Sequence, residues 1–269
     1  MLAVLLPEAE RTGTEVVVVG DVAPGEEAPS ARVRVVRTSS PDMLLLHKLG
    51  IEAASGEVVA IGEDHAVPRP GWCEAVLRAH AERPEPAIVG CLANATDRTL
   101  AGRANFLAFA AAWQPPMPEL PVHRPPPAST MSFKREALRE VASRPAGWLE
   151  AELMPSLFAR GSMAADDRVV VDHHQDHGSL WSVVNAFHSA RSSYGAQRAR
   201  LDRAERRKVA RWAFHNVPPQ LRGEARRGTE DDQLGGAERA LVATISLAAG
   251  VGAAVGALRG PGRSPDRLA

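Results

Sequence analysis

Continuous apolar runs alternate with segments of helical periodicity through the first two thirds of the chain. EVVVVGD at 15–21 is such a run, and an uninterrupted run of this length is typical of a strand buried on both faces. MLLLHKLGIEAA at 43–54 has apolar residues at helical spacing and is followed by Ser55-Gly56, a helix stop. The predicted strands are 15–21, 33–37, 57–65, 87–91, 130–134 and 168–172. The predicted helices are 43–54, a segment that starts at 68–72 and ends at Arg83, one from Arg135, and 148–160, with a long amphipathic stretch at 179–212. This alternation predicts an α/β fold with a mostly parallel sheet that helices cover on both faces.

A second kind of pattern follows near the end of the chain. The uncharged run 240–258 contains 19 residues, which as a helix would be about 28 Å long, barely the thickness of a bilayer core. Small residues recur along it at helical spacing (Ala248, Gly252 and Gly256), the pattern that lets two helices approach closely. Ten Arg/Lys against three acids precede it at 198–227. The run is either a helix buried against the domain or a membrane-embedded or interfacial helix with a basic collar. The collar favours the membrane interpretation.

Composition narrows the function classes. The 269 residues include 32 Lys/Arg and 32 Asp/Glu, and a net charge of zero argues against a dedicated nucleic-acid binder. Two cysteines, Cys73 and Cys91, are neither a disulfide framework nor a structural zinc site, so a reducing cytosol is expected. The opening MLAVLLPEAERTG has no basic stretch and no small-residue cleavage site, so it does not resemble a signal peptide.

Acidic residues stand at the ends of three predicted strands. Asp21 follows the first strand, Glu-Asp-His at 63–65 the third, and Asp-His-His at 172–174 the last. Ligands of open parallel sheets bind outside the carboxyl ends of the strands, where these side chains would gather. Several acids at one edge repel each other unless a cation or a hydrogen-bonding ligand shares them. The pattern favours a site for a metal-bound diphosphate with a ribose or base nearby.

Several segments carry a family resemblance in the family's own order. GEVVAIGEDHAVPRPGWCEAVLRAH resembles the part of family 2 glycosyltransferases in which a strand bears the acidic Asp-X-Asp-type cluster. EVVVVGD is similar to the family's strand with the nucleotide-binding acid, and TMSFKREALREV to its acceptor-side segment. GWLEAELMPSLFARG resembles the helix with the catalytic base, and VVVDHHQDHG the strand and histidine that follow. The resemblance covers about residues 1–200. It implies a GT-A fold and inverting transfer of a sugar from a nucleotide-diphospho-sugar donor.

The resemblance also assigns metal ligands. Glu63 and Asp64 would face the ribose and the metal-diphosphate, and His65 stands where the last acid of Asp-X-Asp usually is. The expected ion is Mn²⁺ or Mg²⁺, with Asp64 and His65 as ligands. A neutral imidazole suits Mn²⁺ better than Mg²⁺. His174, or alternatively His173, would be a further metal or phosphate ligand.

The remaining roles fall on other segments. Asp21 would contact the base or ribose of the donor. The general base maps to Glu150, with Glu152 as the fallback, although residues two apart on a helix face different sides. His47 and Lys48 stand where the family often has Arg-Asn. A phosphate contact from Lys48 is expected, and the alternative is a solvated helix face.

The resemblance fixes an expected organisation of the chain. The family's first strand has no counterpart here, and MLAVLLPEAERTG is similar to the second half of the helix that should follow it. The expected segments are a glycosyltransferase-like domain at 1–200, a basic linker at 201–237, an apolar helix at 238–260 and a tail at 261–269. We expect a cytoplasmic enzyme at the inner face of the cell membrane, acting on a glycan or lipid-linked acceptor. The alternative is a catalytically degenerate domain that serves as a membrane-associated scaffold, motivated by the missing strand and by His65.

Overall fold

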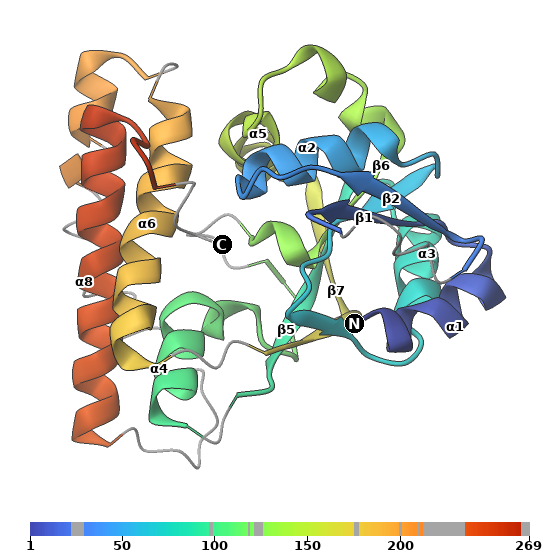
Figure 1. Cartoon of the computed structure of the whole chain (residues 1–269), viewed down its shortest axis with the longest axis horizontal. Helices are drawn as coiled ribbons and strands as arrows, with labels where there is room; N and C mark the ends of the chain where they lie inside the picture. Colours follow the sequence, from blue (N-terminus) through green and yellow to red (C-terminus); the bar gives the residue numbers. More distant parts are fainter. Residues whose placement is uncertain are drawn as a thin grey trace. The chain divides into compact units, whose positions relative to one another are not determined.

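The chain forms two compact units, each with its own core. The computed structural model describes residues 1–22, 30–96, 99–117, 119–120, 126–174, 178–198, 201–208, 210–211 and 235–264 (Figure 1). Unit 1 comprises 1–93 and 113–173, and unit 2 comprises 94–112 and 174–269. The predicted boundaries at 200, 237 and 260 stay predictions, and most of the predicted linker lies outside the described residues.

Unit 1 contains the strands that the structure describes, apart from the last residue of one of them, Asn94. Its elements are α1 (Leu2–Thr12), β1 (Val16–Gly20), β2 (Val33–Arg37), α2 (Met43–Ala53), β3 (Val58–Ala60), β4 (Ala66–Pro68), α3 (Trp72–Glu82), β5 (Ala87–Asn94), β6 (Met131–Lys134), the 3₁₀ turns η3 (Arg135–Leu138) and η4 (Val141–Ser143), the π-helical turn η5 (Leu149–Leu153), α5 (Met154–Ala159) and β7 (Met163–His173). The predicted strand at 57–65 is in fact β3 followed by a turn that holds its acidic residues, and β4 then forms a second short strand. The α/β class is confirmed.

The strands β1 and β2 form a small sheet with a helix on each face. They pair in parallel, with Val16 opposite Val33. Val16 and Val33 pack with Ala9 of α1. On the other face, α2 approaches so closely that a Cβ on Gly50 would lie 3.3 Å from Val19. The side chains of the consecutive valines in β1 therefore point alternately toward α1 and toward α2, so the strand is covered on both faces, as the uninterrupted apolar run predicts.

The larger sheet differs from the prediction. Its strand order is β3-β6-β5-β7-β4, and the β3/β6, β5/β6 and β4/β7 pairs are antiparallel. The prediction of a mostly parallel sheet is therefore wrong. The physical reason is that an apolar run identifies a strand buried on both faces, but it carries no information on strand direction. The short strand β4 and the returning strand β7 pair as neighbours of opposite direction.

A side chain from α1 completes the start of α3. Gly71, with φ of 84°, precedes α3 and has no side chain with which to cap its first turn. Glu8 of α1 accepts hydrogen bonds from the backbone N–H groups of Gly71 and Cys73. The carboxylate is buried, and it stabilises the otherwise unpaired amides at the helix N-terminus. The cap therefore joins two elements that are distant in sequence.

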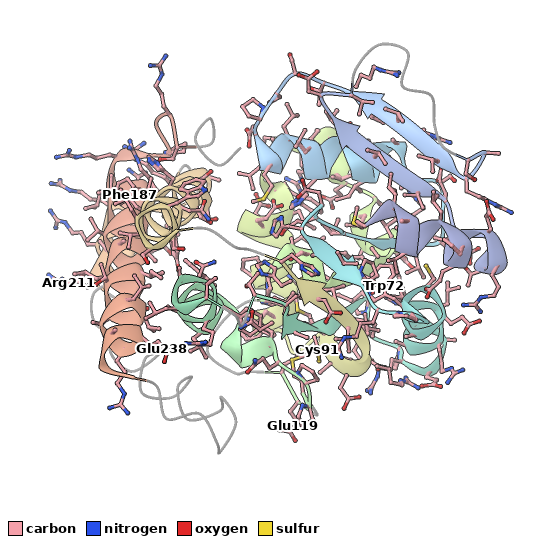
Figure 2. The ribbon with its side chains drawn as sticks, turned by 60° about the horizontal axis from the view of Figure 1, so that its bottom comes forward. Trp72, Cys91, Glu119, Phe187, Arg211 and Glu238 are labelled. Atoms are coloured by element: carbon pink, nitrogen blue, oxygen red, sulfur yellow. The ribbon has the colours of Figure 1, made fainter. Side chains whose placement is uncertain are left out.

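Both cysteines are structural. Cys73 and Cys91 are free thiols and buried, and Figure 2 shows Cys91 within unit 1. Burial, assisted by the charges of Asp167 and Asp166, raises the pKa of Cys91 to about 12. A thiol with such a pKa stays protonated at neutral pH and is a poor nucleophile.

Unit 2 is helical. Its main elements are α4 (Leu100–Phe109), α6 (Ser179–Gln197) and α8 (Gly236–Arg259), and α6 and α8 run side by side (Figure 1). Its core consists of small and branched side chains from all three helices, namely Ala104, Ala108, Ala186, Val242 and Ile245. At the start of α8 the carboxylate of Glu238 forms an ion pair with Arg103 of α4 (Glu238 is labelled in Figure 2).

Glycines on α8 bring it into backbone contact with α6. A Cβ on Gly252 would lie 2.2 Å from the carbonyl oxygen of Phe187, and one on Gly256 would lie 2.5 Å from that of Arg191. The predicted stripe of small residues therefore packs against a helix of the same chain. Only residues without a Cβ allow this approach.

The predicted apolar C-terminal helix is confirmed as α8. By length and composition, this 24-residue helix is apolar enough to cross a membrane, and half of its most apolar stretch is buried. The core helix of a soluble protein has the same properties. The side of α8 away from the core still carries apolar residues, because Leu247 is 54% and Leu258 47% exposed.

Candidate active site

The turn between β3 and β4 places two acids around one imidazole. The Nε2 atom of His65 lies 3.1 Å from Oε2 of Glu63, and its Nδ1 atom lies 3.0 Å from Oδ1 of Asp64. The two acids differ in exposure, since the side chain of Glu63 is 20% exposed and that of Asp64 is 98% exposed. His65 is therefore held from both ends of its ring, by one inner and one outer carboxylate.

A second histidine reaches this turn from β7. The antiparallel β4/β7 register places His173 opposite Ala66, the residue after His65. The rings of His65 and His173 meet edge to face, with 4.9 Å between their centroids. One ligand atom each from Glu63, His65 and His173 lie within 4.8 Å of one another. We call these three residues the Glu-His-His cluster.

Without a cation, the contacts within the cluster favour a negatively charged Glu63 and a positively charged His65. Burial by itself raises the pKa of Glu63, but the hydrogen bond from His65 and the charges of His65, His47 and His173 together lower it below its usual value. The hydrogen bond to Glu63 raises the pKa of His65 to about 9, and the contact with Asp64 adds to the shift. At neutral pH the imidazole of His65 therefore carries a proton, which a metal ion would have to displace.

Of the three metal ligands predicted from the sequence, Asp64, His65 and His174, only His65 belongs to the Glu-His-His cluster. His65 joins the Glu-His-His cluster, whereas Asp64 contacts it only through His65. His173, the alternative to His174, is the histidine that the structure brings to the cluster. His174 itself is exposed.

The two candidate bases lie on the π-helical turn η5, and they face different partners. Oε1 of Glu150 lies 2.7 Å from Nδ1 of His47, and the side chain of Glu150 is only 15% exposed. Oε2 of Glu150 is buried and has no hydrogen-bond partner among the residues that the structure describes. Glu152 instead accepts a hydrogen bond of 3.0 Å from the indole N–H of Trp148. Glu150 thus has a buried oxygen left for a substrate, and π-helical turns often occur at functional sites.

His47 connects the two acidic groups electrostatically. It lies on α2, with its side chain 8% exposed. Burial by itself lowers its pKa, but the hydrogen bond with Glu150 and the charges of Glu150, Glu63 and Asp42 raise it above the usual value. Glu150 and Glu63 of the Glu-His-His cluster are therefore both close enough to act on the imidazole of His47.

The two remaining predicted residues have other surroundings. The ammonium group of Lys48 donates hydrogen bonds to the carbonyl oxygens of Val141, Ala142 and Arg144 and pairs with Glu52 at 3.2 Å. These contacts occupy its N–H donors. Asp21 is exposed and follows β1 directly.

His47 was visible in the sequence only as a departure from the family pattern. A more direct signal is its position on α2, because Leu44, His47 and Ile51 recur at helical spacing and all three are buried. A histidine on a buried helix face needs a polar partner. Periodicity indicates that need, but it does not identify Glu150, which is 103 residues away in the sequence.

Comparison with known proteins supports the fold. No family model matches the chain. No curated protein matches it either. Among solved structures, the chain is similar to the glycosyltransferase TarS of S. aureus, residues 1–349, in complex with UDP-GlcNAc. The TM-score is 0.50 and the sequence identity 12%, and the match covers 82% of this chain and 71% of that one. The chain therefore has a glycosyltransferase fold.

Proposed function

We propose that this protein is an inverting glycosyltransferase of family 2 type that uses a nucleotide-diphospho-sugar donor and a divalent cation. One observation carries the proposal: a glycosyltransferase fold holds, in the same unit, a cluster of potential metal ligands and a buried carboxylate with one unpaired oxygen. The solved structure that the fold resembles contains UDP-GlcNAc, so this donor is the first to test.

The donor set of the cluster fits a divalent cation. Glu63, His65 and His173 would hold it through one carboxylate and two imidazoles, a set that suits Mn²⁺ better than Mg²⁺. Asp64 would accept the other ring N–H of His65 and so orient this ligand, as outer carboxylates commonly do. When bound, the cation offsets the charge that develops on the leaving diphosphate.

The protein's own groups perform the rest of the reaction. Glu150 takes the proton of the acceptor hydroxyl as that oxygen bonds to the anomeric carbon from the face opposite the diphosphate. The bond between the anomeric carbon and the diphosphate oxygen breaks, and its electron pair leaves with the nucleotide. Inversion follows from the single displacement. Asp21 binds the base or ribose, as the family resemblance implies.

Isothermal titration of UDP-GlcNAc tests the proposal. We expect binding in Mn²⁺, weaker binding in Mg²⁺ and none after chelation, because the Glu-His-His cluster holds the cation that the diphosphate needs. Glu63→Gln and His65→Ala should each weaken binding about tenfold or more, whereas the exposed Glu136→Gln, a matched change elsewhere in unit 1, should not. Absence of metal-dependent binding to any UDP-, GDP- or TDP-sugar would favour the scaffold alternative.

Isothermal titration with Mn²⁺ should detect the release of a proton from His65. Because His65 is protonated up to a pKa of about 9 in the metal-free protein, Mn²⁺ binding at pH 7 is expected to release about one proton. The affinity for Mn²⁺ should therefore rise as pH increases toward 9. The observed binding enthalpy should differ between PIPES and Tris, whose ionisation enthalpies differ. Equal enthalpies in the two buffers would argue against His65 as a ligand.

We also propose that unit 2 contacts the inner face of the cell membrane, where a lipid-linked acceptor would be found. Leu247 and Leu258 on the outer side of α8 supply apolar contacts, and the basic residues at 198–211 supply attraction to anionic lipids. Flotation with vesicles containing phosphatidylglycerol should recover the protein, and the double variant Leu247→Ser/Leu258→Ser should float markedly less. Equal flotation of both, or none of the wild type, contradicts this proposal.

A further inference from the structure

His47 is a buried histidine that the proposed reaction does not yet use. It comes from α2, whereas its partner Glu150 comes from η5, and 2.7 Å separates Nδ1 of the first from Oε1 of the second. Both side chains are at least 85% buried. A contact this short between buried groups fixes both side chains, since neither can turn to solvent without losing it.

The contact makes the two oxygens of Glu150 unequal. Oε1 is engaged by His47, whereas Oε2 is equally shielded from solvent and has no partner among the described residues. A buried carboxylate oxygen without a hydrogen bond is destabilising, and such an oxygen in a native protein calls for an explanation. A substrate hydroxyl that donates to Oε2 during catalysis would supply the missing partner.

We propose that His47 is a positioning residue, which holds Glu150 by Oε1 so that Oε2 receives the proton of the acceptor hydroxyl. This inference rests on the proposed function. The proton moves from the acceptor oxygen to Oε2, and the acceptor oxygen bonds to the anomeric carbon. The diphosphate leaves with the electron pair of the broken bond, and His47 keeps its own proton throughout.

The charges around His47 agree with this role. Glu150, Glu63 and Asp42 all act on its imidazole, and each favours the protonated form. A ring N–H that donates to Oε1 holds the carboxylate in place and leaves Oε2 for the acceptor hydroxyl.

Kinetics with conservative variants test the inference. We expect His47→Ala to lower the kcat for UDP release from UDP-GlcNAc about 100-fold, with the donor KM within about twofold of wild type. His47→Gln, whose amide N–H can still donate to Oε1, should recover at least about tenfold of that loss. His80→Ala removes another buried histidine of unit 1, which pairs with Ser132, and should lower the thermal midpoint without lowering kcat.

A measurement independent of turnover accompanies the kinetics. With histidine-selective labelling, NMR titration should show the pKa of His47 falling in Glu150→Gln, because the carboxylate that raises it is gone. An unchanged pKa overturns the inference. So does a wild-type kcat in His47→Ala, or a failure of His47→Gln to recover activity, when Glu150→Gln is inactive. An active Glu150→Gln contradicts Glu150 as the base, and therefore the proposed function itself.

Discussion

Replacing Glu150 by glutamine is expected to lower the kcat of sugar transfer about 10²- to 10⁴-fold, while the Kd for UDP-GlcNAc with Mn²⁺ stays within about twofold of wild type. Glutamine keeps the shape of the side chain but cannot accept a proton at neutral pH. Oε2 of Glu150 is the buried, unpaired carboxylate oxygen on η5, so the change removes the base and leaves the donor site intact. UDP release with and without an added acceptor measures kcat, and calorimetry measures Kd.

Glu152→Gln distinguishes the two candidate bases. Glu152 lies on the same turn, and Trp148 occupies its Oε2 at 3.0 Å. We expect this variant to keep its kcat within about threefold of wild type. If Glu152→Gln abolished turnover and Glu150→Gln did not, the roles would be reversed. Wild-type kcat in both variants would exclude a carboxylate base on η5.

The second large effect is expected at the α6/α8 contact. Gly252→Val should lower the free energy of unfolding by about 3 kcal/mol, because its Cβ would lie 2.2 Å from the carbonyl oxygen of Phe187 and would force the two helices apart. Urea unfolding followed by circular dichroism measures the loss.

Gly236→Ala is the matched change on α8. Gly236 is in the first turn of the same helix and has nothing within 4 Å of its Cβ position. Alanine there should be neutral or stabilising by up to about 1 kcal/mol, since it favours the helix over the unfolded chain. A similar loss of stability in both variants would mean that glycine at 252 is not required by close packing.

The elements of the fold were largely predictable, but their pairing was not. The valines of β1 and β2 and the helical spacing of α2 lie in local sequence, so periodicity identified them. Strand direction depends on which strand becomes the neighbour. The contact of β4 with β7 joins residues about one hundred positions apart, and no local pattern encodes it. The predicted parallel sheet was wrong for this reason.

The candidate site shows the same limit. Glu63 and His65 were predicted as site residues because they lie two positions apart, directly after a predicted strand, in a segment that resembles a family motif. Glu63 was expected at the ribose or diphosphate, and not as a metal ligand. His173 entered only as an alternative to His174, because the choice between neighbouring histidines depends on the β4/β7 register. The contact of His47 with Glu150 joins α2 to η5, and helical periodicity could predict the burial of His47 but not its partner.

The division of the chain into units has a consequence for dissecting the protein. The chain passes from one unit to the other at 93/94, 112/113 and 173/174, so α4 lies between parts of unit 1 in sequence and yet contributes Ala104 and Ala108 to the core of unit 2. A protein shortened to residues 1–173 would keep α4 but lose the helices that cover it. The apolar side of α4 would then face water and promote self-association. Removal of the C-terminal helices would therefore give an aggregation-prone protein, and excision of 94–112 together with 174–269 would be needed to obtain unit 1 alone.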